Sequence, residues 1–331
     1  MEKINRFWMG RRALITGATG LLGSWLVKEL LSVGANVVAL VMDEDPQSEL
    51  YRSGDFKRIS IVNGRLENLR TIERAINTHE TDVVFHVGAQ TLVGAAHRAP
   101  WATFEANIRG TYNLLEACRL HDGLVKRVVI ASSDKAYGEN PALPYVETMP
   151  LYGRRPYEVS KSCADLLAQS YHHTYGLPVA VARCGNIYGG GDLNWSRIVP
   201  GTIRSLLQGE RPIIRSDGTY LRDYLYVEDA AKAYMILAEK IEDKRVKGGG
   251  FNFSPGKPSA VLDIVKAIQK LMKQTALKPD IRNEAKGEIR SQYLSSAKAR
   301  SLLQWQPRHD LEGGLRETID WYRKFLNGSA S

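Results

Sequence analysis

The sequence predicts a doubly wound α/β fold, in which a parallel sheet is covered by helices on both faces. In the first half of the chain, short β-branched runs alternate with longer helical stretches. The β-branched runs are almost continuously apolar, as expected of strands that are buried on both faces. A turn of the form Gly-x-x-Gly-x-x-Gly stands between the first of these runs and the first helical stretch. Together these three observations predict the fold class.

The expected strands follow one another as "RALITG", "NVVALVM", "RISIVNG", "DVVFHVGA", "VKRVVIAS" and "PVAVARCGNIYG". The expected helices lie between them, as "LLGSWLVKELLSVG", "LRTIERAINTH", "FEANIRGTYNLLEACRLHDG" and a stretch from about Tyr157 to Tyr175. Each crossover from one parallel strand to the next should be right-handed.

The composition is that of an ordinary globular protein, with 44% hydrophobic and 24% charged residues. No apolar run reaches the roughly 18–20 residues of a spanning helix, and "MEKINRFWMGRR" lacks the apolar centre of a secretory signal. We therefore expect a cytoplasmic protein with no membrane partner. Cys118, Cys163 and Cys184 show no CxxC spacing, which predicts reduced packing thiols and no metal site.

The net charge of +9 comes from basic residues that are scattered among acids. Neither a zinc-finger spacing nor an RNA-binding signature occurs, so no nucleic-acid partner is expected. Part of the positive charge would meet an anionic small molecule such as a diphosphate. A solvated basic surface is an equally good interpretation for most of these residues.

The glycine turn consists of Gly17, Gly20 and Gly23 within "ITGATGLLGSWL". One glycine permits a tight turn, another lets the backbone approach a pyrophosphate, and the third allows close helix packing. The phosphates would lie at the positive N-terminus of the helix. The position between strand and helix favours a dinucleotide site over a simple turn.

The second expected strand should end beside the adenine ribose, where an acid favours NAD and a basic residue favours NADP. Asp43 follows Met42 and is slightly late for this position, so it is equally a turn residue. No Arg or Lys occupies the immediate strand end. The pattern favours NAD and leaves NADP open.

Beyond Gly189 the regular alternation loosens, which predicts a smaller second lobe. We expect a dinucleotide-binding domain over residues 1–188 with a returning segment at about 225–255. Residues 189–224 and 256–331 would form an interleaved substrate-binding lobe. The length of 331 residues suits two lobes, because single cores stop growing near roughly 250–300 residues.

Two further motifs carry candidate catalytic residues. Tyr157 and Lys161 are four residues apart and share a helix face, where a nearby ammonium would lower the pKa of the phenol and make Tyr157 a proton relay. An exposed helix pair is the alternative interpretation. In "SSDKAYG", Ser133, Asp134 and Lys135 follow a strand directly, and an Asx-type turn with a solvent-facing Lys is the alternative there.

The order of these parts resembles the extended short-chain dehydrogenase/reductase family, whose domain is a Rossmann fold. The resemblance covers nearly the whole chain and includes "HVGAQ", "NIRGTYNLLEAC", "RCGNIYG" and "RDYLYVEDAAKA". It implies that Ser133 bonds the reacting sugar oxygen, that Tyr157 relays the proton and that Lys161 also holds the nicotinamide ribose. It further implies cofactor contacts from Leu22, Leu66 and Ala89.

Within this family, the acid and the lysine after the serine resemble those of the sugar-nucleotide 4,6-dehydratases. Oxidation at C4 makes the C5 proton acidic, so Lys135, or a water that it orders, would remove it. Asp134 would protonate the departing C6 hydroxyl, for which its pKa must rise through burial or a nearby carboxylate. Members that only epimerise C4 usually carry small or apolar residues here.

The segments "FWMGRRALITGATGLLGSWL" and "AQTLV" resemble the CDP-glucose 4,6-dehydratase subgroup, with departures at Ala18, Leu22 and Arg65. A nucleotide-sugar 4,6-dehydratase is therefore the leading hypothesis, and a sugar-nucleotide epimerase is the alternative. A third hypothesis is a non-catalytic dinucleotide-sensing or RNA-associated protein.

The resemblance also implies substrate contacts and an assembly. Arg222 and Arg290 match positions that approach diphosphate oxygens, with Asn186 and Arg197 as lesser candidates, and ion pairing with Asp223 or Glu288 is the alternative role for these arginines. Helices at roughly 101–120 and 157–175 commonly form a four-helix interface in the family, which implies a homodimer.

Overall fold

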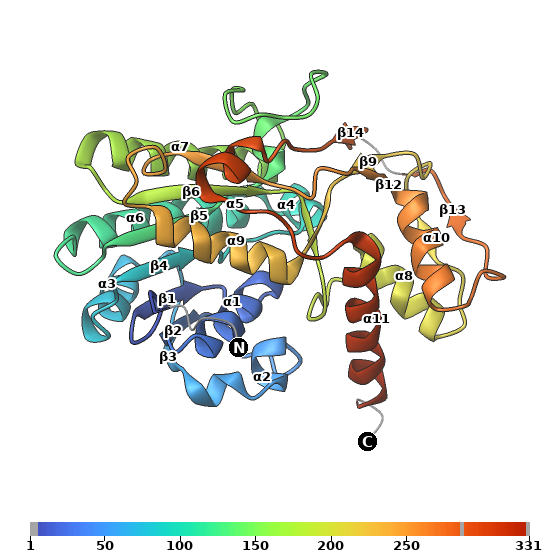
Figure 1. Ribbon diagram of the computed structural model, residues 1–331, viewed down its shortest axis with the longest axis horizontal. Helices are drawn as coiled ribbons and strands as arrows, with labels where there is room; N and C mark the ends of the chain where they lie inside the picture. Colours follow the sequence, from blue (N-terminus) through green and yellow to red (C-terminus); the bar gives the residue numbers. More distant parts are fainter. Residues whose placement is uncertain (1–5, 285–287, 329–331) are drawn as a thin grey trace.

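Seven parallel strands form the main sheet of the computed structural model, in the order β11-β6-β5-β4-β1-β2-β3 (Figure 1). Their bounds are β1 Arg12–Thr16, β2 Asn36–Val41, β3 Ser60–Asn63, β4 Val83–His86, β5 Arg127–Ala131, β6 Val179–Cys184 and β11 Gly250–Phe253. The structure describes residues 6–284 and 288–328, so the predicted lobes and the N-terminal motif are tested only over these ranges. The doubly wound fold prediction is confirmed.

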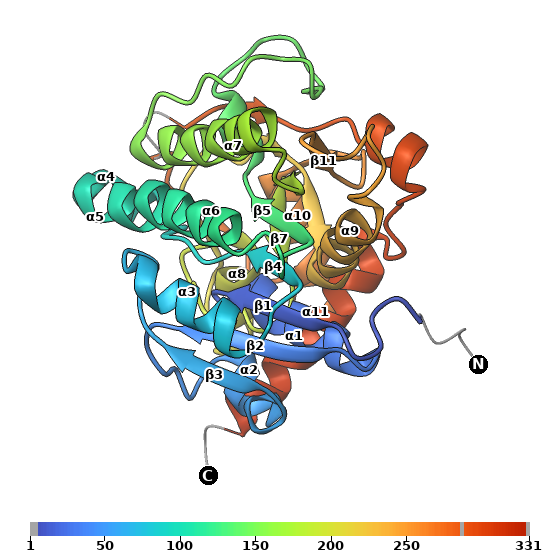
Figure 2. The ribbon, with the colours of Figure 1, turned by 90° about the vertical axis from the view of Figure 1, so that its left-hand side faces the viewer.

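Helices cover both faces of this sheet (Figure 2). On one face lie α3 (Leu69–Thr78), α6 (Gly110–Leu120) and α7 (Pro156–Tyr175), and on the other lie α1 (Leu21–Ser32) and α9 (Val227–Lys240). The strands supply both cores because successive side chains point to opposite faces. In β1, Leu14 packs in the core beneath α3, α6 and α7, whereas Ala13 and Ile15 pack in the core beneath α1 and α9.

The helix expected at about 101–120 is made of three consecutive segments, α5 (Pro100–Phe104), the π-helical η2 (Glu105–Arg109) and α6. A short helix, α4 (Val93–Arg98), precedes them. The π-helical segment contains Asn107, whose side chain is buried. Periodicity did not predict this segment, and π-helical insertions frequently mark functional sites.

The run "PVAVARCGNIYG", expected as one strand, is divided at Gly185. β6 belongs to the main sheet, whereas β7 (Asn186–Tyr188) pairs in parallel with β10 (Tyr224–Tyr226) in a separate sheet. A Cβ atom at Gly185 would lie 2.7 Å from the Cβ of Asp223. The missing side chain therefore lets the backbone after β6 lie directly against the segment before β10.

The remainder of the chain packs beside the carboxyl ends of the strands, on the right of Figure 1. It contains α8 (Ile198–Leu207), α10 (Val261–Leu271) and α11 (Leu311–Asn327) around a core that includes Ile203, Ile264 and Leu315. Short strands complete it: β8 Ile213–Ile214, β9 Leu221–Arg222, β12 Ser259–Ala260, β13 Asp280–Ile281 and β14 Ser291–Gln292. Between these segments the chain returns to the main sheet as α9 and β11.

Four short segments complete the structure: α2 (Glu49–Arg52), the 3₁₀ turns η1 (Asp55–Arg58) and η3 (Asp134–Tyr137), and the π-helical η4 (Ala299–Leu303). Among residues 6–284 and 288–328, no helix combines the length and the hydropathy needed to cross a membrane.

Candidate active site

Two glycines of the turn after β1, Gly17 and Gly23, have no room for a side chain. Gly17 has a φ of +71°, and a Cβ atom there would lie 2.6 Å from the Cα of Gly88. A Cβ atom at Gly23 would lie 2.0 Å from the carbonyl oxygen of Gly17. Gly20 immediately precedes α1, so the free backbone N–H groups of the helix face the turn. This backbone cradle at a helix N-terminus fits the pyrophosphate of a dinucleotide.

Two residues at the end of β2, where the adenine ribose is predicted, carry opposite charges. Asp43 is exposed just beyond β2, as its place in the sequence predicts. The Arg65 guanidinium also reaches this strand end, because its Nη2 lies 3.3 Å from the sulfur of Met42. The sequence shows no basic residue at the strand end, but the fold brings one there from the segment after β3.

The other predicted cofactor contacts line the same edge of the sheet. Leu66 packs against Gly88 and Gly110, where added Cβ atoms would meet its side chain at 3.2 and 2.7 Å. Ala89 follows β4 and is half-buried. Leu22 lies in the first turn of α1 and packs against the core.

The stretch after β5 folds into the 3₁₀ turn η3 and gathers three of the predicted catalytic residues. The hydroxyl of Ser133 donates a 2.8 Å hydrogen bond to Asp134 Oδ1 and accepts one from the Lys135 amide at 3.2 Å. The Lys135 ammonium lies 3.4 Å from Asp134 Oδ1 and 3.5 Å from the side-chain oxygen of Asn186. Asp134 is 1% exposed, and its Oδ2 has no hydrogen-bond partner in the described part of the chain.

Tyr157 and Lys161 lie in the first part of α7, as predicted, but their electrostatics differ from the expectation. Lys161 donates a 2.8 Å hydrogen bond to the carbonyl of Ala131, and burial lowers its pKa to about 8. Burial and the charge of Asp134 raise the pKa of Tyr157 to about 12, against the smaller lowering effects of Arg197 and of hydrogen bonding to Ser133. The prediction that the Lys161 ammonium lowers the pKa of this phenol is therefore wrong, because desolvation is the larger effect and Lys161 bonds to the backbone.

Asn107 is a positioning residue that the sequence analysis missed. Its side chain accepts a 2.7 Å hydrogen bond from the Gln90 amide and donates to the Gln90 carbonyl at 3.0 Å. It also donates to the Ser160 hydroxyl at 2.9 Å, next to Lys161. Asn107 thus joins the segment after β4 to the catalytic helix. In the sequence it is one of two asparagines in the expected helix, Asn107 and Asn113, and the pattern does not set it apart.

A family model described as the NAD dependent epimerase/dehydratase family matches residues 13–252. The chain belongs to this family. The family is described as NAD dependent, which confirms the predicted cofactor. The fold and the glycine turn after β1 agree with this assignment.

The family relatives divide between two activities. The chain is 30% identical to the CDP-glucose 4,6-dehydratase of Salmonella typhimurium, over 97% of this chain and 93% of that protein. It is 31% identical to the UDP-glucuronate 4-epimerase of Thermodesulfobacterium geofontis, over 94% of this chain and 96% of that protein.

Solved structures divide in the same way. UDP-glucose 4-epimerase of Thermotoga maritima, in a structure with UDP-glucose, has a TM-score of 0.86 and 29% identity, covering 95% of this chain and 99% of that one. The dTDP-glucose 4,6-dehydratase of Bacillus anthracis, in complex with NAD, has a TM-score of 0.85 and 25% identity, covering 95% and 97%. Both activities are thus found on this fold within the family.

The four residues that the family pattern assigns to the nucleotide sugar have different surroundings. Asn186 lies beside Lys135. Arg197 pairs with Asp192 at 3.0 Å, and the positive charge of Arg197 acts to lower the pKa of Tyr157. These two residues therefore lie with the catalytic cluster.

The other two arginines lie farther along the second lobe. Arg222 is 8% exposed and donates to the carbonyl of Leu221 at 2.8 Å, to that of Arg290 at 3.0 Å and to that of Ile289. It also lies 3.9 Å from Glu288, in the ion pair that the alternative interpretation expected. The Arg290 side chain is 80% exposed and 3.8 Å from Asp217.

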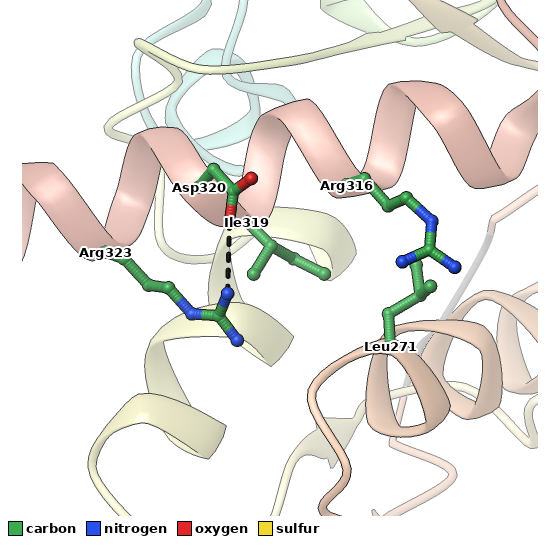
Figure 3. A pocket seen from close by; sticks show the side chains of 5 residues that line it. All are labelled: Leu271, Arg316, Ile319, Asp320 and Arg323. Atoms are coloured by element: carbon green, nitrogen blue, oxygen red, sulfur yellow. Dashed lines mark hydrogen bonds and ion pairs between the residues drawn. The ribbon is translucent and has the colours of Figure 1, made fainter.

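A groove between α10 and α11 is separate from this site (Figure 3). It is lined by Leu271, Arg316, Ile319, Asp320 and Arg323, none of which the sequence analysis selected. Arg323 pairs with Asp320 at 3.1 Å, and Arg316 pairs with Glu312 on the same helix. Its guanidinium groups thus have carboxylate partners.

Proposed function

We propose that the protein is an NDP-hexose 4,6-dehydratase, with CDP-glucose as the leading substrate. The observation that carries this proposal is the buried Asp134, which lies next to Lys135 and has one carboxylate oxygen without a hydrogen-bond partner among residues 6–284 and 288–328. C4 epimerisation needs only the proton relay of Ser133 and Tyr157. A buried acid and an amine beside that relay supply the two groups that an elimination across C5 and C6 requires. The similarity to the CDP-glucose 4,6-dehydratase of Salmonella typhimurium favours the CDP sugar.

The first step is oxidation at C4. Ser133 orients the C4 hydroxyl, and Tyr157 takes its proton. Bound NAD would accept the C4 hydride and return it at C6. The high pKa of Tyr157 makes its phenolate a strong base once formed, and Arg197 stabilises that charged form. Lys161 would hold the nicotinamide ribose. Because burial lowers the pKa of its ammonium to about 8, Lys161 can gain or lose a proton near that pH.

The second step is loss of water from the 4-keto sugar. Lys135, or a water that it orders, takes the proton from C5. Asp134 gives a proton to the C6 oxygen as the C6–O bond breaks, and water leaves. After a hydride is added at C6, Lys135 returns the proton to C5, so the product is a 4-keto-6-deoxy sugar nucleotide with no net oxidation.

An epimerase remains the second candidate function, and the similarity to UDP-glucuronate and UDP-glucose 4-epimerases favours it. In that case Ser133, Tyr157 and Lys161 act alone, and Asp134 and Lys135 hold the shape of the turn η3.

One experiment separates the two functions. The protein with NAD is incubated in heavy water with CDP-, dTDP-, UDP- and GDP-hexoses, and the products are followed by NMR and mass spectrometry. A dehydratase gives a 4-keto-6-deoxy product that carries deuterium at C5. Inversion at C4 without deuterium at C5 would contradict the dehydratase proposal.

The substrate contacts of Asn186, Arg197, Arg222 and Arg290 belong to this proposal. For Arg222 to reach a diphosphate, its guanidinium must exchange a backbone carbonyl for a phosphate oxygen. The division into a cofactor domain of residues 1–188, with a returning segment at about 225–255, and a substrate lobe of 189–224 and 256–331 is likewise proposed, as is a cytoplasmic location.

We also propose a homodimer formed through α5, α6 and α7. These helices contact one another on the outer side of the sheet (Figure 2). Large apolar side chains on them are exposed: Trp101, Tyr112, Leu120, Leu166 and Tyr175. Exposed apolar groups gathered on neighbouring helices are typical of a protein interface.

A further inference from the structure

The proposed elimination requires a proton on Asp134 at the moment when the C6–O bond breaks. An isolated aspartic acid is ionised at neutral pH. The site therefore needs a feature that retains a proton near Asp134 when the substrate is bound.

We propose that Asp134 and Asp223 form a buried carboxyl pair that holds one proton for the elimination, with Asp223 as a positioning residue. This inference rests on the proposed dehydratase function. The sequence suggests for Asp223 only an ion pair with an arginine, and no part of the redox step uses this residue.

The fold connects the two acids, which come from distant parts of the sequence, through Lys135 and Asn186. Asp223 immediately precedes β10, which pairs with β7, and the Asn186 amide donates a 3.2 Å hydrogen bond to the Asp223 carbonyl. The side chain of Asn186 contacts Lys135, whose ammonium contacts Asp134. Because Gly185 has no side chain, the backbone before β7 lies against Asp223.

Both acids are buried and incompletely paired. Each is 1% exposed. Oδ2 of Asp134 and Oδ1 of Asp223 are buried, and within the described residues neither has a hydrogen-bond partner. Buried carboxylates normally accept several hydrogen bonds, so an unpartnered oxygen on each acid, together with the effect of the Asp134 charge on Asp223, favours one proton on the pair over two full charges.

The surroundings of Asp223 fit this assignment. Its Oδ2 accepts a 2.7 Å hydrogen bond from the Leu294 amide, and it also bonds the hydroxyl of Ser254. The charged group that acts on it is Asp134. Burial is the largest cause that raises the pKa of Asp223 to about 7, and the Asp134 charge adds to it, against the lowering effect of the two hydrogen bonds. The pair therefore holds its proton below about pH 7 and loses it above.

Ser133 offers a route by which the pair regains its proton. Over the complete reaction, Asp134 loses one proton to the departing water, and Tyr157 gains one proton from the C4 hydroxyl. The C5 proton does not enter this balance, because it returns to C5. The Ser133 hydroxyl donates to Asp134 Oδ1, and its interaction with the Tyr157 hydroxyl lowers the pKa of that phenol against the larger effect of burial. Transfer through this hydroxyl restores the acid, so the cycle needs no proton from outside the site.

The test uses the full-length protein and measures the carboxyl groups directly. Infrared difference spectra across a pH titration report the C=O band of a protonated carboxylic acid. The wild type should show a buried acid that titrates near neutral pH, and Asp223→Asn should remove that band. Asp134→Asn should move the remaining titration to lower pH, because it removes the neighbouring negative charge. Asp229→Asn, a change of another buried acid held by backbone amides, should leave the band unchanged.

A rate measurement complements the spectra. In Asp223→Asn, transient reduction of NAD by the leading substrate should stay within about threefold of wild type, while dehydration falls at least about tenfold. The alkaline limb of its dehydration rate should also move to lower pH, because the carboxyl of Asp223, whose pKa is raised to about 7, no longer retains the proton. An unchanged titration in Asp134→Asn, or a wild-type pH profile in Asp223→Asn, would overturn the inference. A wild-type protein that forms no 4-keto-6-deoxy product refutes the proposed function instead, since the spectra do not depend on turnover.

Discussion

The hydroxyl of Ser133 donates a 2.8 Å hydrogen bond to the carboxylate of Asp134, the next residue in the chain. The backbone turns sharply here, because Ser133 is extended and Asp134 begins the 3₁₀ turn η3. Two residues to which the proposed mechanism assigns different steps are thus in direct contact. Oxidation at C4 and loss of the C6 hydroxyl would therefore share one proton path.

Replacing Asp134 by Asn should separate these two steps. The amide keeps the size of the side chain and a hydrogen-bond acceptor for Ser133, but it cannot give a proton to the leaving hydroxyl. Dehydration should fall by about 10²–10⁴-fold, while transient NAD reduction, followed by absorbance, persists. Glu139→Gln removes an exposed acid from the following loop and serves as the control. Dehydration at the normal rate in Asp134→Asn would refute the acid assignment.

Two substitutions in the glycine turn should separate an effect on folding stability from an effect on cofactor binding. In Gly23→Ala, the new methyl group would lie 2.0 Å from the Gly17 carbonyl, so the free energy of unfolding should fall by at least about 2 kcal/mol. In Gly20→Ala the nearest atom, the Gly17 carbonyl oxygen, lies 3.3 Å away, and stability should fall by less than in Gly23→Ala. Gly20→Ala should nevertheless weaken NAD binding, because its methyl group stands at the N-terminus of α1. Urea unfolding and calorimetric NAD titration check the two effects, and equal stability of both variants would contradict this description of the turn.

The fold could be predicted from the sequence because its signals are local. Continuous apolar runs, the glycine turn and the alternation of elements follow from short-range patterns, and the structure has the strands and helices that they indicate. The π-helical segment around Asn107 and the division of β6 from β7 could not be predicted in this way. Both depend on which distant segment the backbone meets, as Gly185 meets Asp223.

The candidate site shows the same limit. Ser133, Asp134 and Lys135 are consecutive, so a motif could select them together. Asp223 and Arg65 reach the site only through the tertiary fold. The pKa of Tyr157 was predicted in the wrong direction because a spacing of four residues indicates a shared face, but it does not give the burial that dominates the pKa.

The exposed apolar side chains on α5, α6 and α7 predict that the protein forms a homodimer through these helices. Light scattering after size-exclusion chromatography should give twice the chain mass of 37.0 kDa. Leu166→Glu, which places a charge on an apolar side chain of α7 that is 52% exposed, should shift the protein toward monomer. Ile281→Glu changes an exposed apolar side chain in the other lobe and should leave the mass unchanged. A wild-type protein found only as monomer would refute the dimer.

The buried Lys161 predicts how stability depends on pH. Burial lowers its pKa from 10.5 to about 8, so between these values the unfolded chain binds more protons than the folded chain. The contribution of this group to stability therefore rises with pH across that window, by about 3 kcal/mol in total. Lys161→Met removes the titration and also the hydrogen bond to Ala131. Since loss of that bond is the same at every pH, the stability of Lys161→Met relative to wild type should fall by about 3 kcal/mol between pH 7 and pH 10.5. Urea unfolding at a series of pH values measures this difference, with the exposed Lys240→Met as the control. A difference that stays constant with pH would show that the ammonium carries no burial cost.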